Sequence, residues 1–433
     1  MSVPPAAIAA PKALGRTTRR AAHPVLLMFL AACAVYALVA VGTGDYLYTA
    51  DSDSRFINAG HSTHDPAFIL DLWNKPVLTG LAAGVIALGG GVVAVKVLQG
   101  ILAALALALT ADAARRSGAS TGNAVTAAAL AGLSPFWVRL VFSVLTELSC
   151  AVLLAVALNL WSRRRWPLAA FAVGCSFLAR FEGLFFALAL LPFLIRKRSW
   201  IGIAALGVAP LAWNLAGWAT TGHPFFLLTS EPHELTLEPN FAFWWLMPAM
   251  LPIAAGALVV PALARPRSVP GPALAIAGVT LLLHTLVYTF GFMDSGGRPR
   301  YLVTIIPALA FAAAFGLEGF GRRARAFLFA VAIVLAGLIL AYRPNSWWGS
   351  LALARTPGAL TSSPTVKRLT GAEGITTWRE APAGTLIAWE SGWAPGGAFD
   401  GIPRERLTLL QEVREPKRWP WENDWVGRIY RLN

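Results

Sequence analysis

The stretch DYLYTADSDSRFINAGHSTHDPAFILDLWNKP, residues 45–76, lies between long apolar runs and is itself rich in ionisable side chains. Carboxylates are costly to hold near hydrocarbon, because the bilayer core has no water to solvate them. Most connections between helices are also far shorter than this one. We therefore interpret the segment as a loop that binds a ligand or carries chemistry. Its acidic residues are Asp45, Asp51, Asp53, Asp65 and Asp71.

The composition of the whole chain is that of a membrane protein. Of its 433 residues, 56% are hydrophobic and 13% are charged, whereas a soluble domain carries about 25% charged residues. The net charge of +14 does not indicate nucleic-acid binding, because the basic residues fall in short clusters between apolar runs. All three cysteines lie in apolar runs, so no disulfide framework is implied.

The apolar runs predict an all-α polytopic membrane protein with about eleven transmembrane helices, since one crossing needs about 20 apolar residues. A shorter run, 77–88, is expected to be a re-entrant helix that ends at Gly89-Gly90-Gly91. We read the first span as an uncleaved anchor, because its apolar run is too long for a signal peptide. The candidate spans are 24–44, 92–112, 122–141, 144–161, 167–179, 183–195, 201–219, 241–262, 271–290, 301–320 and 326–342.

The basic clusters orient these spans. Cytoplasmic loops are enriched in Lys and Arg, and with eleven spans every cluster falls on the side of the N-terminus. The loops of the other side are acidic. We therefore expect a multi-pass protein of the inner or plasma membrane, with a cytoplasmic N-terminus and the C-terminus outside. The basic clusters are Arg16, Arg19 and Arg20; Arg115 and Arg116; 163–165; 196–198; Arg265 and Arg267; and Arg322, Arg323 and Arg325.

The chain divides into three expected parts. Residues 1–23 form a cytoplasmic N-terminal segment, and residues 24–342 form the transmembrane domain, in which 45–91 make an outer loop with its short helix. Residues 343–433 have Pro and Gly punctuation, many charges and strand-like runs at 385–389 and 426–430. They predict a small extracytoplasmic α/β domain.

Several charges depart from the positive-inside pattern. Lys75, Arg180, Arg298 and Arg300 are basic residues of the acidic outer face. Each has a simple structural explanation, such as a snorkelling lysine, a local Arg–Glu pair or an interfacial anchor. Together with the acidic loop, they suit a phosphate-bearing lipid, because Arg binds phosphate through two parallel hydrogen bonds and Lys as a point charge. Glu147 and Glu182 lie at or just inside the outer boundary of the membrane. Ionisable side chains at that depth are functional candidates.

The order of these motifs resembles the GT-C type of integral-membrane glycosyltransferases over residues 24–320. Within that type, the chain is most similar to the protein-mannosyltransferase and aminoarabinose-transferase-like group. The shared pattern is an acidic first outer loop, Lys-Pro before a short helix, Arg-x-Glu-Gly, and Arg-Tyr-Leu at the start of a late span. Departures are Asp51-Ser-Asp53 for the usual Asp-Glu, Val77 after Lys75-Pro76, and Phe181 in place of proline.

The resemblance implies an enzyme that moves a hexosyl or pentosyl group from a polyprenyl-phosphate donor to a lipid, glycan or protein acceptor at the outer face. It assigns the general base to Asp51 or Asp53. The implied substrate contacts are Lys75, Arg180, Arg298 and Arg300 on phosphate, Glu182 on the acceptor or on Arg180, Tyr301 beside Arg300, and His61 on the donor headgroup.

Three alternatives stay open at this point. Asp51, Asp53 and His61 offer ligands for a divalent cation, and no other cofactor is indicated. The Trp residues 73, 244 and 245 either stack on sugar rings or form an interfacial belt. The rival function is a transporter or flippase of lipids or lipid-linked sugars. Such a protein is expected to carry functional charges at mid-membrane, whereas here the unusual charges gather at one face.

Overall fold

The computed structural model describes residues 14–229, 271–289 and 299–342. In the C-terminal part it describes residues 350–356, 359–361, 363–371, 381–390, 402, 404–416 and 425–433. The expected span 241–262, Trp244, Trp245 and Arg298 lie outside the described residues.

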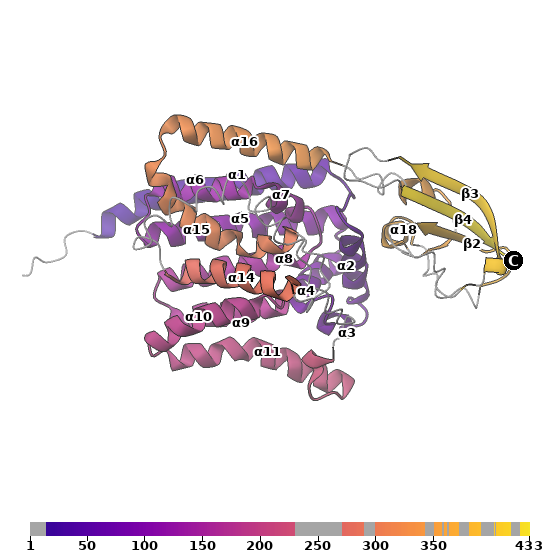
Figure 1. Cartoon of the computed structure of the whole chain (residues 1–433), viewed down its shortest axis with the longest axis horizontal. Coiled ribbons are helices and arrows are strands. Elements are labelled where there is room, and N and C mark those ends of the chain that lie inside the picture. Colours follow the sequence, from indigo (N-terminus) through magenta and orange to yellow (C-terminus); the bar gives the residue numbers. More distant parts are fainter. Residues whose placement is uncertain are drawn as a thin grey trace, which may run out of the picture.

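A bundle of apolar helices makes up most of the molecule (Figure 1), as predicted for a polytopic membrane fold. Each expected span that falls on described residues corresponds to a helix or to a bent helix pair. The helices are α1 (Leu14–Gly42), α5 (Val92–Arg116), α6 (Thr121–Gly132), α7 (Pro135–Val141), α8 (Thr146–Ser162), α9 (Trp166–Ala179), α10 (Gly183–Arg196), α11 (Trp200–Thr221), α14 (Gly271–Thr289), α15 (Ile306–Gly316) and α16 (Arg322–Ala341).

The lengths of these helices are uneven. Within the described residues, five are long and apolar enough to cross a membrane, or six if the bent pair α6–α7 is one span. The pair was expected as one span, 122–141, and it bends by 67° between the two helices. Pro135 lies in the first turn of α7, where proline is favoured because a helix start leaves its N–H group unbonded. The bend therefore comes from a new helix start within the apolar run.

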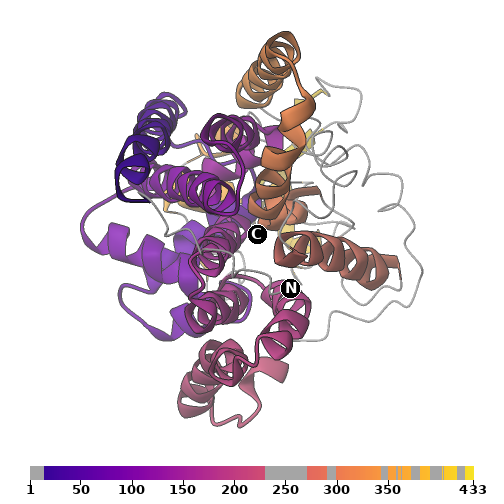
Figure 2. The same ribbon diagram turned by 90° about the vertical axis from the view of Figure 1, so that its left-hand side faces the viewer.

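Small side chains let the central helices pack closely. Figure 2 looks along the bundle from the end away from the sheet. Ala103, Ala127 and Ala310, from α5, α6 and α15, are fully or almost fully buried in one core. In membranes, such small residues allow helix backbones to approach each other. By contrast, Leu38 of α1 and Phe327 of α16 are exposed, as expected of helix faces that contact lipid.

The loop that opens the sequence argument is largely helical. It forms α2 (Ala50–His61), α3 (Ala67–Leu70) and α4 (Pro76–Ala87) at one end of the bundle (Figure 1). Thr49 caps α2 by accepting a hydrogen bond from the Ser52 backbone N–H, a standard helix start. Helix α4 begins one residue before the expected helix 77–88. Its re-entrant placement in a membrane stays a prediction.

The C-terminal segment carries a four-stranded sheet in the order β1-β2-β4-β3. Strands β2 and β4 match the two predicted strand-like runs to within two residues, and Ala388 pairs with Ile429 between them. A short helix, α18 (Pro364–Thr370), lies between the sheet and α2 (Figure 1). The strands are β1 (Leu360–Thr361), β2 (Leu386–Glu390), β3 (Leu407–Glu415) and β4 (Trp425–Leu432).

Candidate active site

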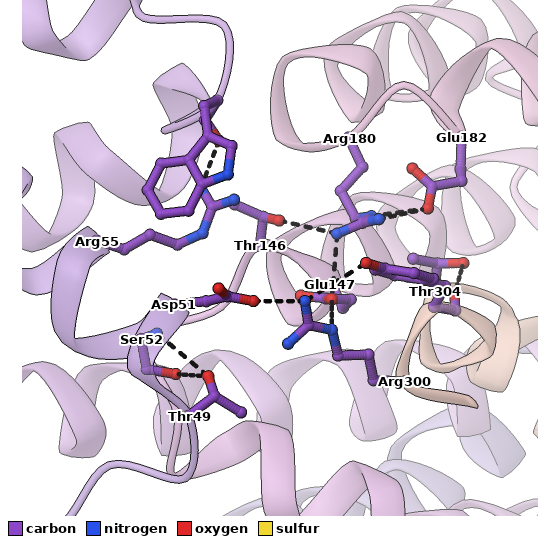
Figure 3. Close-up of polar contacts among 12 residues, drawn as sticks. Thr49, Asp51, Ser52, Arg55, Thr146, Glu147, Arg180, Glu182, Arg300 and Thr304 are labelled. Atoms are coloured by element: carbon purple, nitrogen blue, oxygen red, sulfur yellow. Dashed lines mark hydrogen bonds and ion pairs between the residues drawn. The ribbon is translucent and has the colours of Figure 1, made fainter. Parts of the chain in front are cut away.

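Acidic and basic side chains from four parts of the chain meet in one cluster (Figure 3), at the end of the bundle where α2 lies (Figure 1). Two of these residues, Arg180 and Glu182, come from the turn between α9 and α10. The others come from α2, from the start of α8 and from the 3-10 helix η2 (Pro299–Ile305). The members of this charged cluster are Asp51, Arg55, Glu147, Arg180, Glu182 and Arg300.

Glu147 lies at the centre of the charged cluster and is 1% exposed. Its Oε1 atom is 3.1 Å from a terminal guanidinium nitrogen of Arg180 and 3.3 Å from Nε of Arg300. A buried carboxylate is tolerated only when it is paired. Glu147 therefore holds the two guanidinium groups side by side (Figure 3).

Arg180 is also fixed by its own turn. It contacts Glu182 at 2.7 and 2.8 Å and donates to Thr146 Oγ1 at 3.2 Å. The turn needs glycine at position 183, because a Cβ there would lie 2.3 Å from the Phe177 backbone nitrogen. The local Arg–Glu pair considered from sequence is thus real, but the same arginine also reaches Glu147.

Arg300, in η2, joins that 3-10 helix to α2. One of its terminal nitrogens is 2.6 Å from Asp51 Oδ2. The ring of Tyr301 lies 4.5 Å from the guanidinium carbon of Arg180 and 5.2 Å from that of Arg300, which is cation–π range for both. The structure therefore brings together Asp51, Arg180, Glu182, Arg300 and Tyr301 of the predicted site.

Arg55 is a member of the cluster that was not predicted. Its guanidinium lies 4.1 Å over the Trp73 ring and donates to the backbone carbonyls of Trp73 and Asn74 at 2.6 and 2.8 Å. Burial lowers the pKa of Arg55, and Glu147 partly offsets this effect, so that the pKa is about 10. The available signal was the i, i+4 spacing from Asp51, which places both side chains on one helix face. This spacing has no meaning in a loop, so the prediction of a loop for this segment concealed the signal.

Lys75 lies beside the cluster in an aromatic setting. It has a positive φ of 67° and is 8% exposed. Its ammonium donates to the Leu72 carbonyl and lies 3.4 Å from the Phe181 ring centroid and 5.5 Å from that of Trp213. Burial, with a smaller contribution from the nearby Arg180, lowers the pKa of Lys75 to about 7. Phe181, the departure from the family pattern, is thus the lysine's aromatic partner.

Asp53 is not part of the charged cluster. It is 1% exposed, accepts a hydrogen bond from Thr365 Oγ1 at 2.7 Å and pairs with Arg368, both from α18. Burial raises the pKa of Asp53, although Arg368 and Thr365 act in the opposite direction. The two candidate bases therefore have different environments.

His61 lies at the last residue of α2, exposed, with its ring 5.5 Å from that of Phe68. The structure does not bring it together with Asp51 and Asp53. In the parts of the chain that the structure describes, no group of three or more His, Cys, Asp or Glu side chains is placed to hold a metal ion. The alternative of a divalent cation bound by these three residues thus gains no support.

Comparison with known proteins finds solved structures with a similar fold. No protein-family model matches the chain, and no curated protein matches it either. Among solved structures, ArnT from Cupriavidus metallidurans in the apo state superposes with a TM-score of 0.64 at 15% identity, covering 94% of this chain and 98% of that one. The chain shares the fold of ArnT.

The same enzyme bound to undecaprenyl phosphate matches with a TM-score of 0.61 at 14% identity, covering 93% of this chain and 97% of ArnT. ArnT is an aminoarabinose transferase of the GT-C type. The predicted resemblance to that group is therefore confirmed at the level of the fold, and with the apolar helices it makes this chain a multi-pass membrane protein.

Proposed function

We propose that this protein is a membrane glycosyltransferase that moves a sugar from a polyprenyl-phosphate donor to an acceptor at the outer face of the membrane. The observation that carries the proposal is the pair of guanidinium groups held side by side by Glu147, with Asp51 at their edge. The ArnT fold supports it, because one of the matching structures contains undecaprenyl phosphate.

The cationic side of the cluster suits a phosphate. Arg180 and Arg300 present planar donors that match phosphate oxygens, and Arg55 and Lys75 add positive charge nearby. In this proposal, these four cations bind the donor phosphate and stabilise the charge that it gains on leaving. Arg298 and His61 remain candidate donor contacts.

Asp51 is the better candidate for the general base. Its side chain is 23% exposed, so an acceptor hydroxyl has access to it, as a base requires. Asp53 is buried and already occupied by Thr365 and Arg368. When a phosphate takes over Arg300, Asp51 is released from that ion pair and becomes available to the acceptor.

The proposed reaction forms one bond and breaks one. The acceptor oxygen attacks the anomeric carbon, the bond from that carbon to the phosphate oxygen breaks, and its electron pair leaves with the polyprenyl phosphate. The hydroxyl proton passes to Asp51. Glu182 orients Arg180, and Tyr301 supports both guanidinium groups from one side. The sugar is a hexose or pentose, and the acceptor is a lipid, a glycan or a protein.

Purified protein in liposomes tests the proposal. Polyprenyl-phosphate sugars are placed in the accessible leaflet with a panel of acceptors, and released polyprenyl phosphate is measured, with Asp51→Asn as the inactive control. Release that depends on Asp51 supports the transferase. Translocation of the intact lipid without any release would instead identify the rival flippase.

A further inference from the structure

In the part of the chain that the structure describes, a buried ion pair joins the C-terminal segment to α2, the helix that carries Asp51. Asp53 in the first turn of α2 contacts Thr365 and Arg368 of α18, which are 312 and 315 residues further along the chain. The side chains of Asp53 and Arg368 are 1% and 5% exposed.

A buried ion pair adds little to the free energy of unfolding, but it specifies how the two elements that carry it are arranged. Two buried charges lose their hydration, so the net gain is small, but separating them leaves an uncompensated charge in the interior. Helix α2 is therefore held in the one rotation that keeps Asp53 on Arg368. Any other rotation about the helix axis is disfavoured.

The rotation of α2 also sets the direction of Asp51. Two residues along an α-helix are separated by about 200°, so Asp51 and Asp53 lie on opposite faces of α2. Asp51 meets Arg300 on one side while Asp53 meets Arg368 on the other. A turn of α2 that released Asp53 would withdraw Asp51 from the charged cluster.

We infer that Arg368 and Thr365 are positioning residues, through which the sheet-bearing C-terminal segment holds Asp51 in its working place. The inference rests on the proposed function for the role of Asp51. Neither residue touches the charged cluster of Figure 3 directly; they act through α2.

Such a role requires that α18 is itself held in place by the sheet. Ser363 caps it by accepting from the Val366 backbone N–H, and Thr361, two residues earlier, donates to the Ala388 carbonyl of β2 at 2.8 Å. The last residue of β2, Glu390, is buried and accepts from Ser350. The sheet and α18 thus form one packed unit that contacts α2.

The test compares Arg368→Gln with Arg368→Lys and with Arg428→Gln in full-length protein. Arg428 is the control, since it is an arginine of β4 whose ion-pair partner is Glu412 of β3. We expect Arg368→Gln to lower kcat by about 100-fold, as a misplacement of about 1 Å does, with KM little changed. Lysine should restore part of kcat, and Arg428→Gln should behave as wild type. Equal losses in Arg428→Gln and Arg368→Gln would overturn the inference.

Two further measurements separate this inference from the proposed function. Hydrogen exchange of the α2 amides needs no substrate: faster exchange in Arg368→Gln supports positioning, and unchanged exchange with unchanged kcat overturns it. If wild type transfers no sugar, the proposed function fails while hydrogen exchange still decides the coupling. Finally, Asp53→Asn combined with Arg368→Gln should regain turnover lost in the single variants. Failure to regain any turnover would overturn the positioning role.

Discussion

Asp51 and Asp53 lie two residues apart on α2 but bind opposite parts of the molecule. Asp51 Oδ2 is 2.6 Å from Arg300 of the transmembrane bundle, and Asp53 is 2.7 Å from Thr365 of the C-terminal segment. From the sequence, either residue was a candidate base. The structure gives them distinct partners, so substitutions at the two positions should have distinguishable consequences.

Replacing Asp51 with asparagine should abolish transfer and leave donor binding largely intact. The amide keeps the size of the side chain but cannot take a proton, and loss of a general base costs about 10²–10⁴ in rate. Single-turnover transfer and binding of undecaprenyl phosphate, measured on the same preparation, check this. Wild-type turnover in Asp51→Asn would exclude Asp51 as the base.

Replacing Arg180 with lysine should reduce both turnover and donor affinity, although the charge is kept. The planar fork that makes two parallel hydrogen bonds is lost, and a charge-assisted contact contributes about 1.5–3 kcal/mol, or roughly 10- to 150-fold. Arg163→Lys is the matched control. It replaces an arginine that pairs with Asp112 at 3.0 Å, at the far end of α8. Similar losses in both variants would indicate a general effect on the fold.

Replacing Glu147 with glutamine should destabilise the empty protein more than the donor-bound one. Breaking a buried ion pair costs about 3–5 kcal/mol because the partner charges remain, and here two arginines lose their shared carboxylate. A bound phosphate returns negative charge to the same place. We therefore expect a lower thermal midpoint and a larger upward shift with undecaprenyl phosphate than in wild type. Glu405→Gln, at an exposed position, should change neither value.

Donor affinity should fall as pH rises through about 7. Because burial lowers the pKa of Lys75 to about 7, its ammonium is lost above that pH, and with it one phosphate contact. The measurement is binding of a polyprenyl phosphodiester between pH 6 and 9, since a phosphodiester has no second ionisation near pH 6, unlike a phosphate monoester. Lys75→Met should bind more weakly at pH 6 and show a flatter profile.

Stability should respond to pH with the opposite sign. An unfolded lysine has a pKa of about 10.4, so the unfolded chain binds more protons than the folded one between pH 7 and about 10. The contribution of Lys75 to the free energy of unfolding therefore rises with pH across that window. If Lys75→Met retained the wild-type pH dependence of both affinity and stability, the depressed pKa would belong to another group.

Reporter fusions check the orientation expected from the basic clusters. Fusions after Arg116, Arg165, Arg198 and Arg325 should report the cytoplasm, and one after residue 433 should report the outside. A cytoplasmic C-terminus would require an even number of crossings. Reversed reports from all five fusions would instead place the charged cluster and the sheet on the side where a donor in the outer leaflet has no access.

The sequence alone determined the features that depend on local pattern. Apolar runs of sufficient length predicted the helices, because a spanning helix satisfies its own backbone hydrogen bonds. Short strand-like runs predicted β2 and β4. Lys75, Arg180 and Arg300 stood out because charges at a membrane boundary are costly and therefore rare. None of these inferences required knowledge of which segments touch.

Only the tertiary structure decided which charges meet. Arg300 contacts Asp51 across 249 residues of sequence, and Arg368 contacts Asp53 across 315. Such pairs depend on how helices pack, which local pattern does not encode. The structure also shows that part of the acidic loop is the helix α2. Its helical geometry places Asp51 and Asp53 on opposite faces and Arg55 on the same face as Asp51. The distinction between the two aspartates is therefore a property of packing, and their number and spacing a property of the sequence.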